Sequence, residues 1–377
     1  MRGLRVHITG SAAAGGDDAL IAAAHSFVRT LAAETIAYGG GLVLGAGGEP
    51  RNETGQPCIF DWTALEVIAD APDPAPGWPQ LRPERFVAVA SQRGLDKIPA
   101  YRTEIWERCC RRSDFQLVVA PPGWRMAGII RERQVLRGDI LLALGGGAGA
   151  EHLAELYSDE GKPVVPIRAE LGAYNHDGNG GSRFLHARAI ANPDDFFRLR
   201  DGAGSATAHI SNLRLRTDTD TGAMARQAAK LLTDLRPRPA FYVRLLNTSH
   251  PDYPAVERFF RDVVDTVVAK RGFTPHDMGR GRPQAAFINV EIFEAIHRAG
   301  LVIVDLTGVR PNCTMELGYA LARHRRVVIS ARKGTQLPFD EDKLPTYIWE
   351  DTGTSAEHLE EYRQWFDRNS DLPPIVE

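Results

Sequence analysis

The chain has 377 residues, of which 43% are hydrophobic and 25% are charged, as in ordinary globular proteins. This length exceeds what a single hydrophobic core commonly holds, so we expect two domains. The formal net charge of −3, from 45 basic and 48 acidic residues, excludes a global basic field and argues against nucleic acid as a partner.

The apolar segments are too short for a secretion signal or a membrane span. The run at residues 4–8 ends before Gly10, and no stretch reaches about 18 apolar residues. The four cysteines match neither a zinc pattern nor a disulfide framework, so we expect no metal site and a cytoplasmic location. No base lies near Cys313 in the sequence, which favours a buried structural thiol over a nucleophile.

Short apolar runs alternate with amphipathic stretches in the first half of the chain. Strands are expected at 4–8, 42–44, 86–90, 115–120, 139–144 and 162–167, and helices at 19–38, 61–69 and 151–157. Strands that alternate with helices predict a parallel sheet, which binds ligands beyond the carboxyl ends of its strands.

Three of these strands end in glycine-rich turns, at residue 10, at 45–48 and at 145–149. Exposed backbone amides and the helix N-terminus after the third turn suit a phosphate. A tight turn without a ligand is the alternative at each position, but three turns on one sheet edge favour nucleotide binding. The expected nucleotide-binding residues are Gly10, Ser11, Gly45, Gly47, Gly48, Gly146, Gly147 and Gly149. Nearby Arg93, Lys97 and Arg102 are either phosphate contacts or a solvated charged face.

The composition changes between residues 201 and 237, where small and polar residues precede a short helical pattern and two prolines. We interpret this segment as a linker with one helix. A second alternation follows, with strands expected at 241–246, 301–305 and 326–330 and helices at 253–270, 287–298 and 315–323. The expected fold is α/β, with two Rossmann-like domains of mainly parallel sheets, residues 1–200 and 238–377, joined by the linker 201–237.

The strongest candidates for catalytic residues lie in residues 303–322, IVDLTGVRPNCTMELGYALA. Asp305 ends a buried strand, and a helix that we expect to begin near Thr314 presents Glu316 in its first turn. A fixed carboxylate can stabilise or trap the positive charge that develops at an anomeric carbon when a sugar–base bond breaks. Each residue also has a structural explanation. Glu316 would be favoured near a helix N-terminus by the helix dipole alone, and Asp305 would be an ordinary turn residue at the end of a strand.

This segment resembles the nucleoside 2-deoxyribosyltransferase-like superfamily, which is related to the NAD-cleaving Toll/interleukin-receptor-like domains. The resemblance covers residues 240–350 and rests on the strand IVDL, the loop, and NCTMELGYA. It implies that Glu316 is the nucleophile at the anomeric carbon. From the chemistry of the reaction, we expect Asp305 to hold either a ribose hydroxyl or the geometry of the nucleophile. Tyr242, Asn247 and Asn312 are expected to contact the substrate, because the loop after the first strand should face the same sheet edge. The alternative for Tyr242 is a structural role, because it alternates with the inward-facing Phe241.

The first half resembles the SLOG superfamily, a Rossmann-like group that includes the LOG phosphoribohydrolases and the Smf/DprA proteins. The motifs are ITGSA at 8–12, VLGAGG at 43–48 and LALGGGAGAEHLAEL at 142–156. The LOG motif PGGxGTxxE has Ala150 here in place of its threonine and Leu153 in place of its last glutamate. This departure favours a nucleotide sensor, a module that also accompanies effector domains in bacterial antiviral proteins.

Together the resemblances imply an N-glycosidase regulated by a nucleotide signal, with NAD⁺ as the expected substrate, in bacterial antiphage defence. We expect no required cofactor, a nucleotide-derived ligand in the first domain, and association into a homo-oligomer. A nucleoside 2-deoxyribosyltransferase of nucleotide salvage is one alternative, although it would not need an appended sensor. A non-catalytic nucleotide-binding or assembly module is the other.

Overall fold

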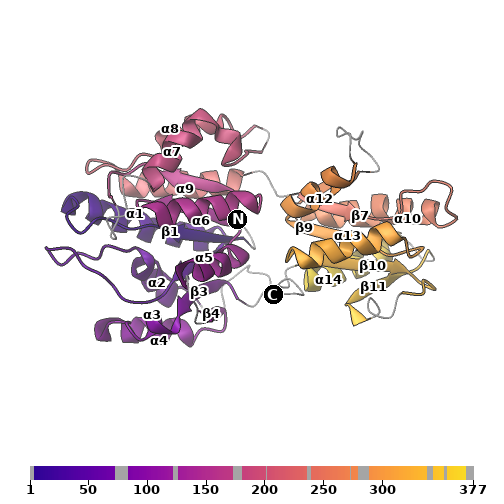
Figure 1. Cartoon of the computed structure of the whole chain (residues 1–377), viewed down its shortest axis with the longest axis horizontal. Coiled ribbons are helices and arrows are strands. Elements are labelled where there is room, and N and C mark those ends of the chain that lie inside the picture. The colour runs from indigo at the N-terminus through magenta and orange to yellow at the C-terminus, as the bar shows by residue number, and fades with distance from the viewer. Residues whose placement is uncertain are drawn as a thin grey trace. The chain divides into compact units, whose positions relative to one another are not determined.

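The computed structural model divides the chain into two compact units, Met1–Arg236 and Pro237–Glu377 (Figure 1). Each unit is a parallel sheet covered by helices, so the expected α/β class with two Rossmann-like domains is confirmed. The structure describes residues 4–72, 84–121, 126–172, 181–200, 202–235, 239–271, 273–278, 288–337, 343–351 and 355–370.

Six parallel strands form the sheet of the first unit, in the order β4-β3-β2-β1-β5-β6. The strands are β1 (Arg5–Thr9), β2 (Gly41–Gly45), β3 (Phe86–Ser91), β4 (Phe115–Ala120), β5 (Ile140–Leu144) and β6 (Val164–Ile167). Val6 of β1 pairs with Leu42 on one side and Ile140 on the other. The strand order therefore reverses between β1 and β5, the kind of switch point at which such sheets bind ligands.

Helices cover both faces of this sheet. They are α1 (Asp18–Ala37), α2 (Asp61–Asp70), α3 (Gln92–Leu95), α4 (Thr103–Cys110), α5 (Met126–Arg137), α6 (Ala148–Asp159), α7 (Ser182–Ala191), α8 (Ala206–Asn212) and α9 (Thr221–Asp234). Because side chains alternate along a strand, Val43 packs against Ile130 of α5 while Leu42 and Leu44 join the core with α1 and α2. Alternate side chains of the strands therefore enter the cores on the two faces of the sheet.

The segment expected to be a linker holds two helices, α8 and α9, that belong to the first unit. Helix α9 packs on α1 and buries Met224, Ala228 and Leu232 in the first core. The hydroxyl oxygens of Ser26 on α1 and Thr221 on α9 lie 2.8 Å apart. The apolar face of α9 thus extends the first unit to residue 236, and the small polar residues before it do not separate it from that core.

The second unit has five parallel strands in the order β11-β10-β9-β7-β8. They are β7 (Pro239–Val243), β8 (Thr274–His276), β9 (Leu301–Asp305), β10 (Val327–Arg332) and β11 (Thr346–Trp349). Helices α12 (Ile288–Arg298) and α13 (Pro311–Ala322) cover one face. The other face carries α10 (Tyr253–Phe259), a π-helical turn (Phe260–Val264), α11 (Asp265–Lys270) and α14 (Ser355–Asn369).

Two negative findings hold within the described ranges. None of the helices there is both long and apolar enough to cross a bilayer. No group of three or more histidine, cysteine or acidic side chains is placed to hold a metal ion in those ranges. The four cysteines are free thiols.

Candidate functional sites

The three glycine-rich turns lie side by side, because β2, β1 and β5 are neighbours and run parallel. The turns after β1 and β5 touch through their backbones. A Cβ added to Gly10 would lie 1.7 Å from the Leu144 carbonyl oxygen, and one added to Gly145 would lie 2.2 Å from that of Ser11. Gly146 N also donates to the Ser11 carbonyl over 2.8 Å. Gly10 and Gly145 are therefore required by packing, whatever the turns bind.

The start of α7 closes one side of the third turn. Gly145 N donates to Ser182 Oγ and Gly181 N to Glu151 Oε1, both over 2.6 Å. A Cβ on Gly181 would lie 1.9 Å from the Gly146 carbonyl oxygen. Gly181 and Ser182 were not predicted from the sequence because no helix was expected at α7, although a glycine followed by a serine is typical of a helix start.

The turn after β2 has partners of its own. Gly45 N donates to the buried Asp61 carboxylate over 2.6 Å, and Trp62 Nε1 donates to the Gly47 carbonyl oxygen over 3.1 Å. Burial raises the pKa of Asp61. Gly48 rests against Lys97. Gly45 and the Gly47 carbonyl thus hold β2 to α2, which leaves them little capacity to bind a phosphate.

The N-terminus of α6 is the part of this edge that suits an anion. Gly147 caps the helix without a side-chain hydrogen bond, and the first amides of a helix have no intrahelical acceptor. The guanidinium of Arg131 lies beside Gly149, where an added Cβ would be 2.8 Å from Nη2. Of the predicted nucleotide-binding residues, Gly147 and Gly149 are those best placed to meet a phosphate.

In the second unit, α13 begins earlier than expected. It starts at Pro311, with Arg310 as its N-cap residue, so Glu316 lies in the second turn and not in the first. Proline suits the first helical position because it has no amide hydrogen to satisfy there. Thr314 is inside the helix, and its hydroxyl donates to the Arg310 carbonyl oxygen. The prediction that the helix begins near Thr314 was therefore wrong, and attraction to the helix dipole, which fades within the first turn, does not explain Glu316.

The Glu316 carboxyl group is half-buried, and burial raises its pKa to about 7. Its neighbour on the preceding turn, Cys313, packs against the sheet with Leu317 and Ala320. Burial, with the nearby charges of Glu316 and Asp305, raises the pKa of the Cys313 thiol to about 12. A thiol in that state is no nucleophile at neutral pH, whereas Glu316 can exchange a proton there.

Asp305 is fully buried at the carboxyl end of β9. Its carboxylate accepts hydrogen bonds from Thr307 N at 3.1 Å, Ser330 Oγ at 2.8 Å and Trp349 Nε1 at 2.8 Å. These donors come from the loop after β9 and from β10 and β11, so Asp305 holds three chain segments in register. Burial raises its pKa, although the hydrogen bonds oppose that shift. The geometry suits a positioning residue.

The three residues expected to contact substrate are placed differently from one another. Tyr242 is buried on the face of the sheet opposite α13, where it packs edge-on against Phe260. Its hydroxyl group donates a hydrogen bond to Asp265 Oδ1 over 3.0 Å. Asn312 is exposed in the first turn of α13, and Asn247 is exposed in the loop after β7. The two asparagines remain accessible to a ligand at the sheet edge, whereas Tyr242 supports the core.

The loops after β7 and β9 meet at this edge. The His250 ring packs on Gly308, where an added Cβ would lie 2.9 Å from Cε1, and Gly308 has a φ of +77°. Asp252 binds Arg332 at the end of β10 over 2.7 Å. Polar groups from three strands therefore gather beyond the sheet, and the sequence analysis gave no role to Asp252 or Arg332.

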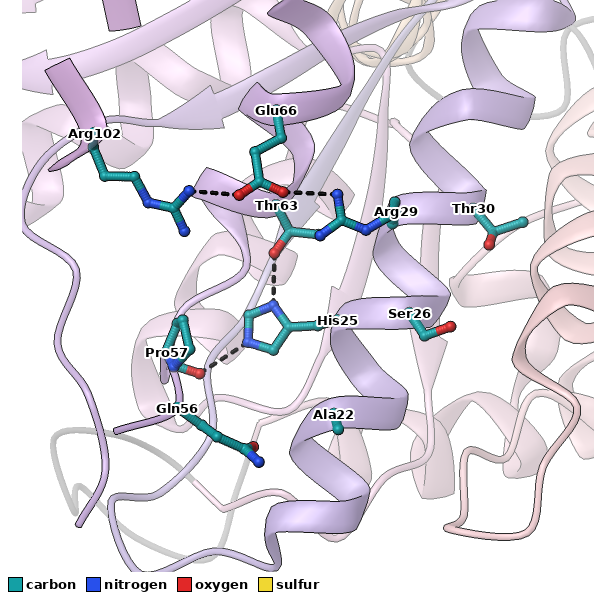
Figure 2. Close-up of a pocket in the computed structure, with 10 residues that line it drawn as sticks. All are labelled: Ala22, His25, Ser26, Arg29, Thr30, Gln56, Pro57, Thr63, Glu66 and Arg102. Atoms are coloured by element: carbon teal, nitrogen blue, oxygen red, sulfur yellow. Dashed lines mark hydrogen bonds and ion pairs between the residues drawn. The ribbon is translucent and has the colours of Figure 1, made fainter. Parts of the chain in front are cut away.

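A separate cavity of about 440 Å³ lies between α1 and α2 in the first unit (Figure 2). Its polar side chains bind one another: His25 Nδ1 is 2.6 Å from Thr63 Oγ1, and Glu66 lies between Arg29 and Arg102 at 2.7 and 2.5 Å. Arg102 also binds the buried Glu49. This mutual pairing indicates a structural network. Arg102 binds two carboxylates in it and is therefore not placed to bind a phosphate.

Comparison with known proteins identifies a family for the first unit and curated relatives of the chain. A family model described as ATP nucleosidase Cap17-like, N-terminal, matches residues 1–236. ATP nucleosidase Cap17 of Escherichia coli strain KTE188 is 30% identical over 193 residues, which are 51% of this chain and 37% of that protein. A second Escherichia coli protein of the same name matches to the same extent. The chain thus spans little more than a third of the length of these curated relatives.

A solved structure of a Clostridium botulinum CMP N-glycosidase, BcmB, is also similar at a low level. It shares 12% identity with a TM-score of 0.24, over 33% of this chain and 98% of that one. A score this low carries no argument about fold or function.

Proposed function

The chain belongs to the Cap17-like N-terminal family, and on that premise we propose that it is an N-glycosidase that cleaves the sugar–base bond of a nucleotide. The observation that carries the proposal is the half-buried Glu316 carboxyl, whose pKa of about 7 suits chemistry at neutral pH. A role in bacterial antiphage defence accompanies the proposal, on the strength of the sequence resemblances described above.

We place the chemistry in the second unit. The family match ends at residue 236, whereas Glu316, Asn312 and the polar loops around His250 lie beyond it. The family match therefore does not cover this site. NAD⁺ is the substrate that the resemblance of residues 240–350 implies, and ATP is the substrate in the name of the relatives. Both contain an adenine nucleotide, so both belong in the test.

In the proposed reaction, the ionised Glu316 carboxylate approaches the anomeric carbon as the bond to the base breaks. The bonding electrons leave with the base, and Glu316 either bonds to the carbon or stabilises its positive charge until water attacks. Water supplies the new hydroxyl group and its proton goes to solvent, which restores the carboxylate. Nicotinamide leaves NAD⁺ as a neutral molecule, so its departure needs no acid. Adenine leaves ATP as an anion unless it gains a proton, which it takes up from solvent in exchange for the one that the attacking water releases.

Asp305 and the first unit take supporting parts in this proposal. The bonds from Asp305 to Ser330 and Trp349 hold the strand ends that carry the loops around Glu316. The first unit senses a nucleotide at Gly147 and Gly149, and regulation proceeds through association of chains into a homo-oligomer. Light scattering with and without nucleotide tests this association, and a mass that does not change contradicts it.

The product profile of the full chain tests the proposed activity. The protein is incubated with NAD⁺, with ATP, and with a deoxynucleoside plus a different free base, and products are identified by mass spectrometry. Free nicotinamide or free adenine is the expected result and also decides between the two substrates. Exchange of bases between deoxyribose groups would indicate a transferase instead, and the absence of any product, with and without added nucleotides, would leave a binding module.

A further inference from the structure

A second cavity of the first unit has a lining unlike that of the network between α1 and α2. It measures about 640 Å³ and lies between α7 and the chain that leaves β6. Its lining residues are Arg168, Glu170, Arg183, Phe184, His186, Ala187 and Ile190. None of these is a glycine of the three turns, and the volume falls in the range of small-molecule sites.

Positive charge gathers around this cavity. Arg168 and Arg183 both pair with Glu170, at 3.5 and 2.7 Å, and all three side chains are about half exposed. Arg214 lies beside Arg168 through a parallel bridge between their backbones. Exposed ion pairs add little stability, so the single carboxylate does not prevent the arginines from binding a stronger anion. A phosphate group, which guanidinium groups bind in bidentate fashion, is such an anion.

A phenylalanine ring and a buried imidazole complete the lining. Phe184 is 47% exposed, unusual for a large apolar side chain, and Arg188 lies 5.8 Å from the centre of its ring. His186 is 1% exposed, and its Nε2 lies 2.8 Å from the Ile210 carbonyl oxygen. A carbonyl only accepts hydrogen bonds, so Nε2 carries the hydrogen and Nδ1 is left as an acceptor.

The charge state of His186 agrees with this tautomer. Burial lowers the pKa of the ring, the hydrogen bond to Ile210 opposes that shift, and the charges of Arg214 and Arg168 add to it. The imidazole is therefore neutral at pH 7, and it offers an acceptor rather than a third cation. A ligand that fills the cavity needs an anionic group for the arginines, a flat ring for Phe184 and a hydrogen-bond donor for Nδ1.

We propose that this cavity, between α7 and the chain after β6, binds a nucleoside phosphate at a site separate from the glycine-rich turns. The phosphates bind Arg168 and Arg183, the base stacks on Phe184, and a donor group of the base or sugar bonds to His186 Nδ1. The inference concerns the first unit alone and does not depend on cleavage at Glu316.

Calorimetry on the full chain tests the inference, with Glu316→Gln in every protein so that no nucleotide is consumed. The probes are ATP, GTP, CTP and UTP, with adenosine and inorganic triphosphate as fragments. We expect at least one nucleotide to bind more tightly than either fragment. Arg168→Ala with Arg183→Ala should weaken that binding at least tenfold, and Phe184→Ala about tenfold through lost stacking.

Matched variants control for general effects. Arg198→Ala removes another exposed arginine of the first unit, and Tyr38→Ala removes an aromatic ring that is 46% exposed, so both should bind as the parent does. Gly147→Val reports on the glycine-rich turns and should leave the cavity site intact. Binding that disappears in Gly147→Val but persists in the Arg168/Arg183 double variant would overturn the inference. So would the absence of nucleotide binding, or equal binding of inorganic triphosphate alone.

Discussion

Two carboxylates near the same sheet edge have different environments, and this difference separates their roles. Asp305 is surrounded by three donors, so it is satisfied and inaccessible. Glu316 is partly open, and burial without a recorded hydrogen bond among the described residues raises its pKa to about 7. The sequence predicted Glu316 as the nucleophile and Asp305 as a supporting residue, but it did not reveal the donors that hold Asp305, because Ser330 and Trp349 lie 25 and 44 residues from Asp305 along the chain.

The pKa of Glu316 predicts a pH dependence for the proposed cleavage. Burial favours the protonated form, so the carboxylate that the reaction needs is lost as the pH falls through about 7. We expect kcat/KM to be level above pH 8 and to fall about tenfold for each unit below pH 6. Rates measured from pH 5.5 to 8.5, with circular dichroism at each pH to show that the fold persists, check this. A rate that stays constant down to pH 5.5 would remove Glu316 as the ionising group.

At the scale of elements, the buried strands were predicted, whereas the short strands β8 and β11 and several helices were not. The buried parallel strands are continuous apolar runs, as at Ile140–Leu144, and such runs stand out in a sequence. Helix α13 was placed too late because its first turn, PNCT, contains no strong helix former and its N-cap Arg310 makes no side-chain cap. Helix α7 was not predicted because its amphipathic pattern is weak. Ser182 and the cavity around Phe184, which depend on this helix, were therefore not predicted either.

The close contact between the turns after β1 and β5 predicts that one methyl group added at Gly10 strongly destabilises the first unit. In Gly10→Ala the added Cβ would overlap the Leu144 carbonyl oxygen at 1.7 Å, and the residue would have a φ of +148°. We expect a loss of about 3 kcal/mol or more in the free energy of unfolding of the first unit. Chemical denaturation of the full chain measures it.

Gly15→Ala is the matched control for that substitution. Nothing lies within 4 Å of a Cβ at Gly15, which has no positive φ, so this variant should change stability by less than about 1 kcal/mol. Equal stability of the two variants would mean that the backbones at Gly10 and Leu144 do not approach as described.

At the scale of the whole molecule, the boundary between the units lies after α9. The buried face of α9, with Met224, Ala228 and Leu232, covers α1. Composition alone suggested a linker because glycine, serine and threonine are frequent from residue 201 onward. The apolar spacing within 221–234 was visible in the sequence, but nothing in it said which helix the face would meet.

This boundary predicts which fragment of the chain can fold. A fragment of residues 1–236 should unfold cooperatively, because it keeps the whole first core. A fragment of residues 1–200 would expose the α1 surface that α9 covers, and we expect it to aggregate or to melt at least about 10 °C lower. Differential scanning calorimetry of both fragments compares them. Equal melting temperatures would show that α9 adds nothing to the first core.

The central claim, cleavage of a nucleotide at Glu316, is tested most directly by one pair of substitutions. Glu316→Gln keeps the shape of the side chain and removes its charge, while Glu350→Gln does the same at an exposed carboxylate that binds Lys333. The measurement is the release of nicotinamide from NAD⁺ and of adenine from ATP by the full-length proteins. We predict that Glu316→Gln lowers the rate at least about 100-fold, as expected for the loss of one electrostatic contact to the transition state. Glu350→Gln should match the unsubstituted chain. Near-full release by a folded Glu316→Gln protein would contradict the account.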